Sequence, residues 1–144
     1  RLENWGADDT KIVDVSGMDA GNKSTPRNML KIFTRILENP NIKNAIAKDK
    51  FTFQELPVVK TKAAKHTVTN PSQSVSTANK NYKILASKTG YTDEAGAVTL
   101  MLIESKKPKK QYTVITMGGK DTKNEEANKI AKWISTGDVK LTNN

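Results

Sequence analysis

Two stretches near the start of the chain carry apolar residues at helical spacing. The first begins at Thr25-Pro26, where threonine can cap free backbone amides and proline occupies the first helical position without losing a hydrogen bond. The second begins at Asn39-Pro40. The apolar positions of the two stretches are Leu30, Phe33 and Leu37, then Ile42, Ala45 and Ile46. We therefore predict two helices that bury these faces in a core.

The middle of the chain combines a short strand-like segment with a long polar one. Residues 51–54 alternate apolar and polar side chains, which predicts a half-buried strand. Residues 60–81 are mostly polar and predict a long loop or a solvated hairpin. The one histidine, His66, lies in this segment without a neighbouring cluster of carboxylates or metal ligands, so we expect it at the surface.

Three apolar segments in the second half of the chain predict β-strands. Residues 82–88 resemble a strand that leads into a Lys-Thr-Gly turn, and residues 97–103 are apolar enough for a central strand covered on both faces. Residues 112–117 form the third segment. The short connections imply an antiparallel meander. The lysine-rich connection at 106–110 predicts a hairpin tip that stays in water.

The last predicted element is a helix. Thr122 and Glu125 have the spacing of a capping box, and Gly137 is a typical helix end. The apolar stripe of this helix consists of Ala127, Ile130, Ala131 and Ile134. We expect the helix to lie across the predicted sheet.

Length and composition narrow the class of protein. A chain of 144 residues suits one domain. Its hydrophobic fraction of 35% suggests a polar surface or a piece of something larger. No apolar run is long enough to cross a membrane, and the absence of cysteine excludes disulfides and cysteine nucleophiles. Because the sequence starts at Arg1 rather than at methionine, we expect it to be the interior of a longer chain.

The net charge of +9 is concentrated in the second part of the chain. Residues 59–144 hold fifteen basic and seven acidic residues, which accounts for +8 of the total. Such a surface could meet a nucleic acid, an anionic wall polymer or a membrane. No interleaving of basic and aromatic residues and no nucleic-acid reader motif occurs. We therefore favour a solvated lysine-rich surface and expect no nucleic-acid partner.

One short motif carries candidate chemistry. Lys88-Thr89-Gly90 matches the third signature of penicillin-recognising serine enzymes, whose other signatures are Ser-x-x-Lys and a Ser-x-Asn-type triplet. An isolated triplet is a weak signal, because an ordinary turn on a basic surface would look the same. The residues around it therefore decide whether it marks a site.

Those surrounding segments resemble a known family. Residues 16–29 are similar to its Ser-Gly-Leu-Asp segment and the helix start that follows, residues 79–81 to its Asn-x-Asn element, and residues 88–96 to its extended Lys-Thr-Gly block. In this order they resemble the serine-type D-alanyl-D-alanine carboxypeptidases, the low-molecular-mass penicillin-binding proteins. The resemblance covers nearly all of residues 1–136.

The sequence departs from the family pattern in informative places. It contains no Ser-x-x-Lys and no Ser-x-Asn triplet, which precede the Ser-Gly-Leu-Asp segment in the family. We therefore expect the C-terminal portion of such an enzyme, without its nucleophile. Ala86-Ser87 stands where the family commonly has glycine and an aliphatic residue. Asn79 and Asn81 could be family-type structural amides or simple loop residues.

The resemblance implies a fold as well as an activity. We expect an α/β (α+β) chain that forms part of a β-lactamase/transpeptidase-like fold, with helices packed on an antiparallel sheet. Because the early strands of that fold would be missing, we expect marginal stability, self-association or a complementing N-terminal segment. The expected parts of this single domain are a helical part at 1–50, a strand and polar loop at 51–81, antiparallel strands at 82–119, a helix at 120–137 and a tail at 138–144.

The resemblance also implies roles for five residues. Lys88 would place positive charge near the nucleophile and the substrate carboxylate, and the Thr89 hydroxyl would bind that carboxylate. Gly90 would let the substrate backbone approach closely. The backbone N–H of Tyr91 would donate to the oxyanion, and Thr92 would have a secondary role. No cofactor and no metal are implied.

The implied substrate is the peptidoglycan stem peptide ending in D-Ala–D-Ala, and β-lactams would bind the complete enzyme. The implied location is extracytoplasmic, in a bacterial cell envelope or secreted. The enzyme would remove the terminal D-Ala through an acyl-serine intermediate, and this chain alone would be inactive. The alternative is a non-catalytic relative that binds wall peptides or a partner protein.

Overall fold

A computed structural model describes residues 2–56, 63–72, 79–120 and 124–137. Among these residues no helix is long and apolar enough to cross a membrane. The elements run in the order η1 (Glu3–Trp5), α1 (Pro26–Leu37), α2 (Pro40–Ile46), β1 (Lys50–Gln54), β2 (Lys65–Thr69), β3 (Tyr82–Thr92), β4 (Gly96–Lys106), β5 (Lys109–Gly119) and α4 (Glu125–Thr136).

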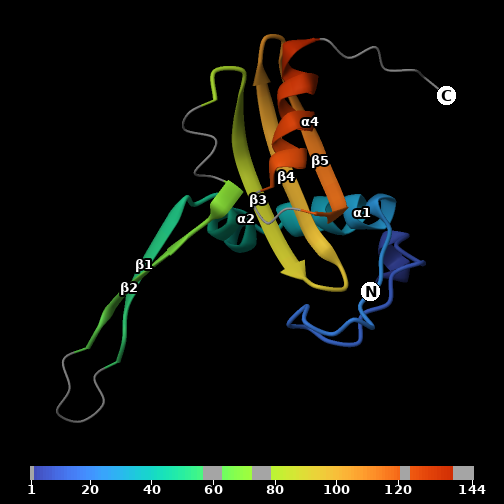
Figure 1. Ribbon diagram of the computed structural model, residues 1–144, viewed down its shortest axis with the longest axis vertical. Helices are drawn as coiled ribbons and strands as arrows, with labels where there is room; N and C mark the ends of the chain where they lie inside the picture. Colours follow the sequence, from blue (N-terminus) through green and yellow to red (C-terminus); the bar gives the residue numbers. More distant parts are fainter. Residues whose placement is uncertain (1, 57–62, 73–78, 121–123, 138–144) are drawn as a thin grey trace.

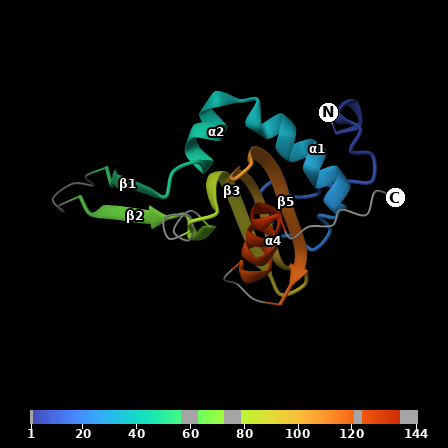
Figure 2. The same cartoon turned by 90° about the horizontal axis from the view of Figure 1, so that it is seen from above.

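The body of the molecule is a three-layer stack around the antiparallel sheet β3-β4-β5. Helix α4 covers one face of the sheet, and α1 and α2 lie on the other (Figures 1 and 2). The predicted meander is confirmed, including the solvated tip between β4 and β5. Its central strand β4 is largely buried, as its apolar sequence predicted.

The main core lies between the sheet and α4. It consists of Tyr82, Ile84, Met101, Ile103, Val114, Ala127 and Ala131. Small residues on α4 let the helix approach the sheet closely, whereas Ile130 of the predicted stripe is 36% exposed. The predicted helix end is confirmed, since Gly137 takes the left-handed conformation at the C-cap. The helix begins after Asn124 as its N-cap residue; Thr122 of the predicted capping box lies outside the described residues.

The first two helices form where the sequence predicted them, but fewer of their apolar side chains are buried than predicted. The Thr25 hydroxyl accepts a hydrogen bond from the Asn28 amide at 3.2 Å, as expected for the cap of α1. Phe33 is buried, whereas Leu30 is exposed. No residue of α2 is buried, so the predicted buried face of this helix is wrong. Helix α2 has only seven residues and lies beside the sheet. Nothing among the described residues covers its outer side.

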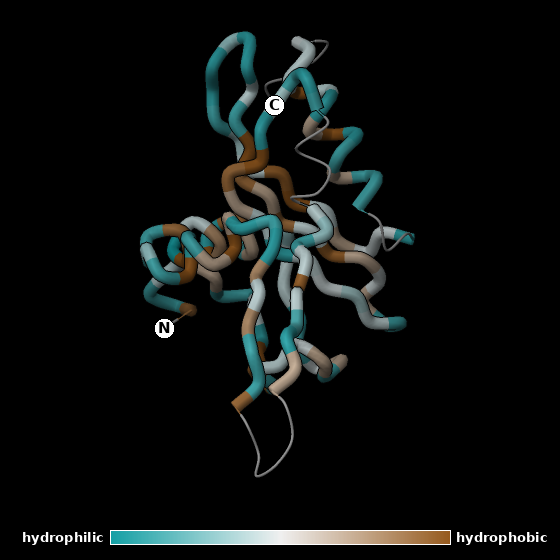
Figure 3. The backbone as a smooth tube through the Cα atoms, turned by 90° about the vertical axis from the view of Figure 1, so that its left-hand side faces the viewer, coloured by the Kyte–Doolittle hydropathy of each residue, from teal (hydrophilic) through white to brown (hydrophobic). Residues whose placement is uncertain are grey.

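Strands β1 and β2 form a separate two-stranded hairpin that projects away from the body (Figures 1 and 3). Every residue of both strands is exposed, so the prediction of a half-buried strand at 51–54 is wrong in its burial. The alternation is real, because Phe51 pairs with Val68 and Phe53 with His66 on one face. His66 is exposed, as predicted, and lies 2.7 Å from the Glu55 carboxylate.

A β-bulge in β3 decides which face carries the Lys-Thr-Gly triplet. Ile84 pairs with Ile103 and Ala86 with Leu102, so Leu85 is the extra residue. Without it, alternation would place Lys88 on the same face as Ile84, against α4. With it, Lys88 lies on the opposite face. The triplet belongs to the strand, which continues to Thr92, so the prediction of a turn at Lys-Thr-Gly is wrong.

Candidate functional site

The Lys-Thr-Gly triplet lies on an edge strand of the sheet. Lys88 pairs with Leu100 and Gly90 with Val98, so β4 occupies one edge of β3. In the part of the chain that the structure describes, no strand pairs with the other edge. An edge of this kind can accept an extended peptide through backbone hydrogen bonds. Lys88 is exposed at this edge.

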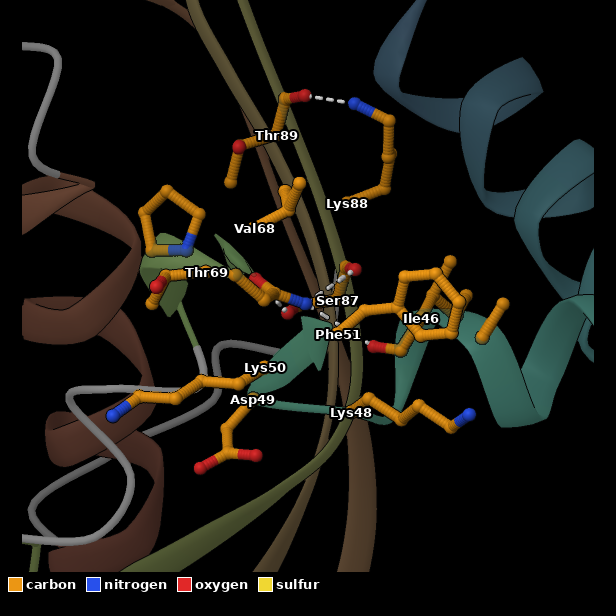
Figure 4. A pocket seen from close by; sticks show the side chains of 13 residues that line it. Ile46, Lys48, Asp49, Lys50, Phe51, Val68, Thr69, Ser87, Lys88 and Thr89 are labelled. Carbon is orange, nitrogen blue, oxygen red and sulfur yellow. Dashed lines mark hydrogen bonds between the residues drawn. The ribbon is translucent and has the colours of Figure 1, made fainter. Parts of the chain in front are cut away.

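A pocket of about 250 Å³ lies beside the start of the triplet (Figure 4). Its wall is built from the end of α2, the base of the β1-β2 hairpin and β3. The lining residues are Ala45, Ile46, Lys48, Asp49, Lys50, Phe51, Val68, Thr69, Asn70, Pro71, Ser87, Lys88 and Thr89. Three lysines against one aspartate give the pocket a positive balance, which favours an anionic group such as a carboxylate.

Asn70 ties the three walls of this pocket together. Its side-chain amide donates to the carbonyl oxygens of Ile46 at 3.3 Å and Ser87 at 3.4 Å. Its Oδ1 accepts from the Ser87 hydroxyl at 3.2 Å and from the Ser72 amide at 3.2 Å. Because these partners come from α2, β3 and the segment after β2, this one side chain fixes the hairpin base against the strand.

The pocket does not present an obvious nucleophile. Ser87 lines it, but this residue is 1% exposed and its hydroxyl is held by Asn70. The Lys88 ammonium turns back to donate to the Thr89 carbonyl (Figure 4). The site can therefore bind and orient a ligand, whereas a covalent step needs a nucleophile from another segment.

The remaining predicted residues lie just beyond the pocket on β3. An added Cβ at Gly90 would meet no heavy atom within 4 Å of those that the structure describes. The fold itself therefore leaves open space beside Gly90. Tyr91 is 49% exposed and pairs with Ala97. The Thr92 hydroxyl accepts the Ala95 amide at 3.1 Å and so belongs to the turn that follows β3.

The structure brings together Lys88 and Thr89 with an amide that the sequence did not indicate. Asn70 is that amide, and its only sequence signal is the turn-like Asn70-Pro71. Asn79 and Asn81 lie at the opposite end of β3. There, Asn79 Oδ1 accepts the Asn81 amide at 2.9 Å, and the Asn79 carbonyl oxygen accepts from the Lys106 ammonium at 3.3 Å. Their observed contacts are structural.

The Ser-Gly-Met-Asp segment forms a hydrogen-bonded loop away from the pocket. The Asp14 carboxylate accepts from the Ser16 hydroxyl and from the backbone amides of Ser16 and Met18 at 2.5, 3.1 and 3.0 Å. These bonds, led by the one from the Ser16 hydroxyl, lower the pKa of Asp14 to about 2. Asn22 closes the loop by accepting the Val13 amide at 2.8 Å.

Known structures share this fold. A D-alanyl-D-alanine carboxypeptidase from Mycobacterium tuberculosis H37Rv aligns with a TM-score of 0.70 at 18% sequence identity, over 98% of this chain. A penicillin-binding protein homologue from Mycobacterium tuberculosis aligns with a TM-score of 0.71 at 17% identity, over 99% of this chain. The alignments cover 52% of each of those chains, so this chain spans about half their length. The predicted fold class is thereby confirmed.

Sequence comparison gives a more specific result. No curated protein sequence matches the chain. A family model, D-alanyl-D-alanine carboxypeptidase, matches residues 1–121 and so covers most of the 144 residues. The matched range includes the loop with Asp14, Asn70 with its hydrogen-bond partners, and the whole of β3 with the Lys-Thr-Gly triplet. The chain therefore belongs to the D-alanyl-D-alanine carboxypeptidase family.

Proposed function

We propose that this chain supplies the substrate-binding wall of a serine D-alanyl-D-alanine carboxypeptidase. The observation that supports this most is the Lys-Thr-Gly triplet on a strand edge that no described strand pairs with, beside a pocket with a positive balance and open space at Gly90. A peptide ending in D-Ala–D-Ala is extended, has a free edge of amides and carbonyls, and ends in a carboxylate. It matches each of these features.

In the proposed reaction, a serine hydroxyl from another segment attacks the carbonyl carbon of the D-Ala–D-Ala bond. The bond to the terminal D-Ala nitrogen breaks, a proton passes to that nitrogen, and D-Ala leaves. Water then attacks the acyl-serine ester, which releases the shortened peptide and restores the hydroxyl. These 144 residues contain no Ser-x-x-Lys, so the proposed reaction takes both the nucleophile and its lysine partner from another segment.

The proposed roles of the wall residues follow from their positions. Lys88 attracts the substrate carboxylate and the developing negative charge, and the Thr89 hydroxyl donates to the carboxylate. Gly90 admits the substrate backbone, and the Tyr91 N–H donates to the oxyanion. Loss of one such donor typically raises the barrier by about 3 kcal/mol. Thr92 supports the strand through the turn after β3 rather than touching substrate.

A fluorescent penicillin and a peptide ending in D-Ala–D-Ala test this proposal. The protein that includes the segments outside these residues should form a stable acyl-enzyme and release D-Ala. Lys88→Ala should abolish both, whereas Lys83→Ala, at an exposed lysine on the same strand, should leave both nearly unchanged. Stable acylation of the 144-residue chain by itself would overturn the assignment of the nucleophile to another segment.

A non-catalytic relative that binds wall peptides or a partner protein is the second candidate. The absence of Ser-x-x-Lys from these residues is compatible with both candidates. The encoding gene distinguishes the two candidates, since the enzyme requires Ser-x-x-Lys and Ser-x-Asn triplets outside this chain. Without them, the protein should bind a D-Ala–D-Ala peptide and release no D-Ala.

Family membership also supports an extracytoplasmic location, because peptidoglycan stem peptides are outside the cytoplasm. We propose the cell envelope or the medium as the place of action, with the stem peptide as natural ligand and β-lactams as ligands of the complete enzyme. Fractionation of the source cells tests the location: recovery with the cytoplasmic fraction alone would argue against it.

A further inference from the structure

A second pocket, of about 280 Å³, lies at the end of the sheet far from the Lys-Thr-Gly triplet. The start of β3, the β4-β5 turn and the C-terminal end of α4 meet there (Figure 1). Three of its lining residues are lysines, and we refer to it as the lysine pocket. The lining residues are Lys80, Asn81, Lys106, Lys107 and Ser135.

Within the described residues, the lysines of this pocket have no acidic partners. Across the residues that the structure describes, no carboxylate forms an ion pair with Lys80, Lys106 or Lys107. The Lys106 ammonium donates to the neutral carbonyl of Asn79 at 3.3 Å. Three like charges around one hollow repel one another, and an anion placed between them would reverse that repulsion.

The neighbouring lysines at the start of β5 differ from those of the lysine pocket because both have partners. The Lys109 ammonium lies 4.0 Å from the Glu104 carboxylate, and the Lys110 ammonium lies 5.5 Å from the centre of the Tyr112 ring. Both therefore have partners on the surface of β5 and β4. Among the described residues of this region, the lysines without an acidic or aromatic partner are therefore those of the lysine pocket.

A buried hydroxyl gives an independent indication of a ligand. Ser135 is 5% exposed, lines the lysine pocket, and its Oγ has no hydrogen-bond partner among the described residues. Buried polar groups are nearly always paired, because an unpaired one forgoes its hydrogen bond with water. Ser135 therefore presents an unused donor beside three cations.

We propose that the lysine pocket binds a phosphate group. Phosphate offers several strong acceptor oxygens, enough for ammonium groups from two sides and for the Ser135 hydroxyl together, whereas a carboxylate has two oxygens. Lysine is a common phosphate ligand because it acts as a compact point charge. A free phosphate ester and an anionic lipid headgroup share this chemistry. The site is separate from the Lys-Thr-Gly wall, so it does not depend on the proposed function.

The competing explanation is structural: lysines at the C-terminal end of α4 stabilise the negative end of the helix dipole. The two explanations differ in what the lysines do to phosphate affinity and to folding. In a phosphate site, removing lysines weakens phosphate binding. In a purely structural role, it lowers the melting temperature and leaves phosphate binding unchanged.

Titration of the 144-residue chain with inorganic phosphate, followed by amide NMR shifts, tests the proposal. We expect saturable shifts at Asn81 and Ser135. The double variant Lys106→Gln/Lys107→Gln should weaken binding by about tenfold or more, a change of 1.4 kcal/mol. Its control is Lys109→Gln/Lys110→Gln, which removes the same charge from the start of β5 in the same hairpin and should change affinity by less than about twofold.

Equal weakening in the two double variants, or shifts that never saturate, would overturn the site in favour of general surface charge. Lys80→Gln and Ser135→Ala provide a second route should the double variant unfold, because each changes a different element, and each should weaken binding. Melting temperatures of all variants are measured in parallel. A lowered melting temperature with unchanged phosphate affinity would establish the structural role and refute the proposal.

Two further arms distinguish the source of the phosphate. Glycerol phosphate represents a soluble ester, and phosphatidylglycerol vesicles represent a lipid headgroup, with phosphatidylcholine vesicles as control. If only the binding of glycerol phosphate is weakened by loss of Lys106 and Lys107, the ligand is a soluble ester. If the binding of phosphatidylglycerol vesicles is weakened, the ligand is a lipid headgroup. Binding in neither arm would contradict the proposal.

Discussion

At Gly90, the fold tolerates a side chain, whereas the proposed ligand requires that there be none. Its backbone does not need glycine, and a methyl group there would meet nothing within 4 Å. Gly90→Ala should therefore leave the free energy of unfolding unchanged or raise it by about 0.4–1 kcal/mol. The methyl group would occupy the space that a peptide backbone needs, so affinity for a D-Ala–D-Ala peptide should fall by about tenfold or more. Chemical denaturation and peptide titration measure the two quantities.

Gly96, across the turn from Gly90, provides the matched control. It has a φ of +64°, and an added Cβ would lie 2.7 Å from the Gly119 carbonyl oxygen. Gly96→Ala should destabilise the chain by about 1 kcal/mol or more. If Gly90→Ala destabilises the chain as much as Gly96→Ala does, then Gly90 is a structural residue and its proposed role is wrong.

Asn70 is expected to position the Lys-Thr-Gly strand rather than to touch substrate chemistry. Asn70→Ala removes its bonds to Ile46, Ser72 and Ser87 and leaves partly buried groups unpaired. We predict a loss of about 1–3 kcal/mol in the free energy of unfolding. Hydrogen exchange at the Lys88 amide should also accelerate. Asn41→Ala, on the exposed side of α2, is the control and should change neither quantity appreciably.

At the scale of elements, local signals predicted where segments begin and end, and non-local contacts decided what they bury. The Thr25 cap and Gly137 act through neighbouring residues, so the sequence was sufficient to place the start of α1 and the end of α4. The burial of residues 51–54 depends on whether a third layer covers the hairpin, and among the described residues none does. Alternation alone carries no information about that layer.

In the candidate site, too, the residues that are adjacent in the sequence could be predicted, whereas the contacts between distant segments could not. Lys88, Thr89 and Gly90 are adjacent in the sequence, so their motif could be recognised directly. Asn70 reaches β3 only through the fold, seventeen positions before Ser87, and no spacing rule predicts that contact. The bulge at Leu85 was equally hidden, since residues 82–88 read as one regular strand.

The loop around Asp14 should respond to acid as a unit. The folded-state pKa of about 2 lies below the ordinary 3.8, so the carboxylate stabilises the loop above about pH 4. That stabilisation is lost as the pH falls from about 4 to about 2. The protection factors of the Ser16 and Met18 amides, which are corrected for the intrinsic pH dependence of hydrogen exchange, should fall across this window. Asp14→Asn should remove the pH dependence; an unchanged pH profile in this variant would contradict the assignment.

At the scale of the whole molecule, the β1-β2 hairpin and both edge strands of the sheet, β3 and β5, are open to solvent within the described residues. The hairpin β1-β2 projects from the body with exposed aromatic side chains, and β5 pairs on one side only within the described residues (Figure 1). β5 spans Lys109–Gly119, which makes it a long edge. Long unpaired edges present rows of free amides and carbonyls to other chains. The stability of this chain should therefore depend on what covers that edge.

We predict that the isolated 144-residue chain self-associates through β5. Sedimentation velocity should show a mean mass that rises with protein concentration. Thr113→Lys places a charge on the edge strand and should shift the chain towards monomer, because an edge lysine must be desolvated when two strands pair. Thr67→Lys, on the solvated hairpin, adds the same charge away from β5 and should leave association unchanged. A monomer at every concentration, with a high melting temperature, would show that the free edge does not drive association; equal effects of the two lysines would locate the contact elsewhere.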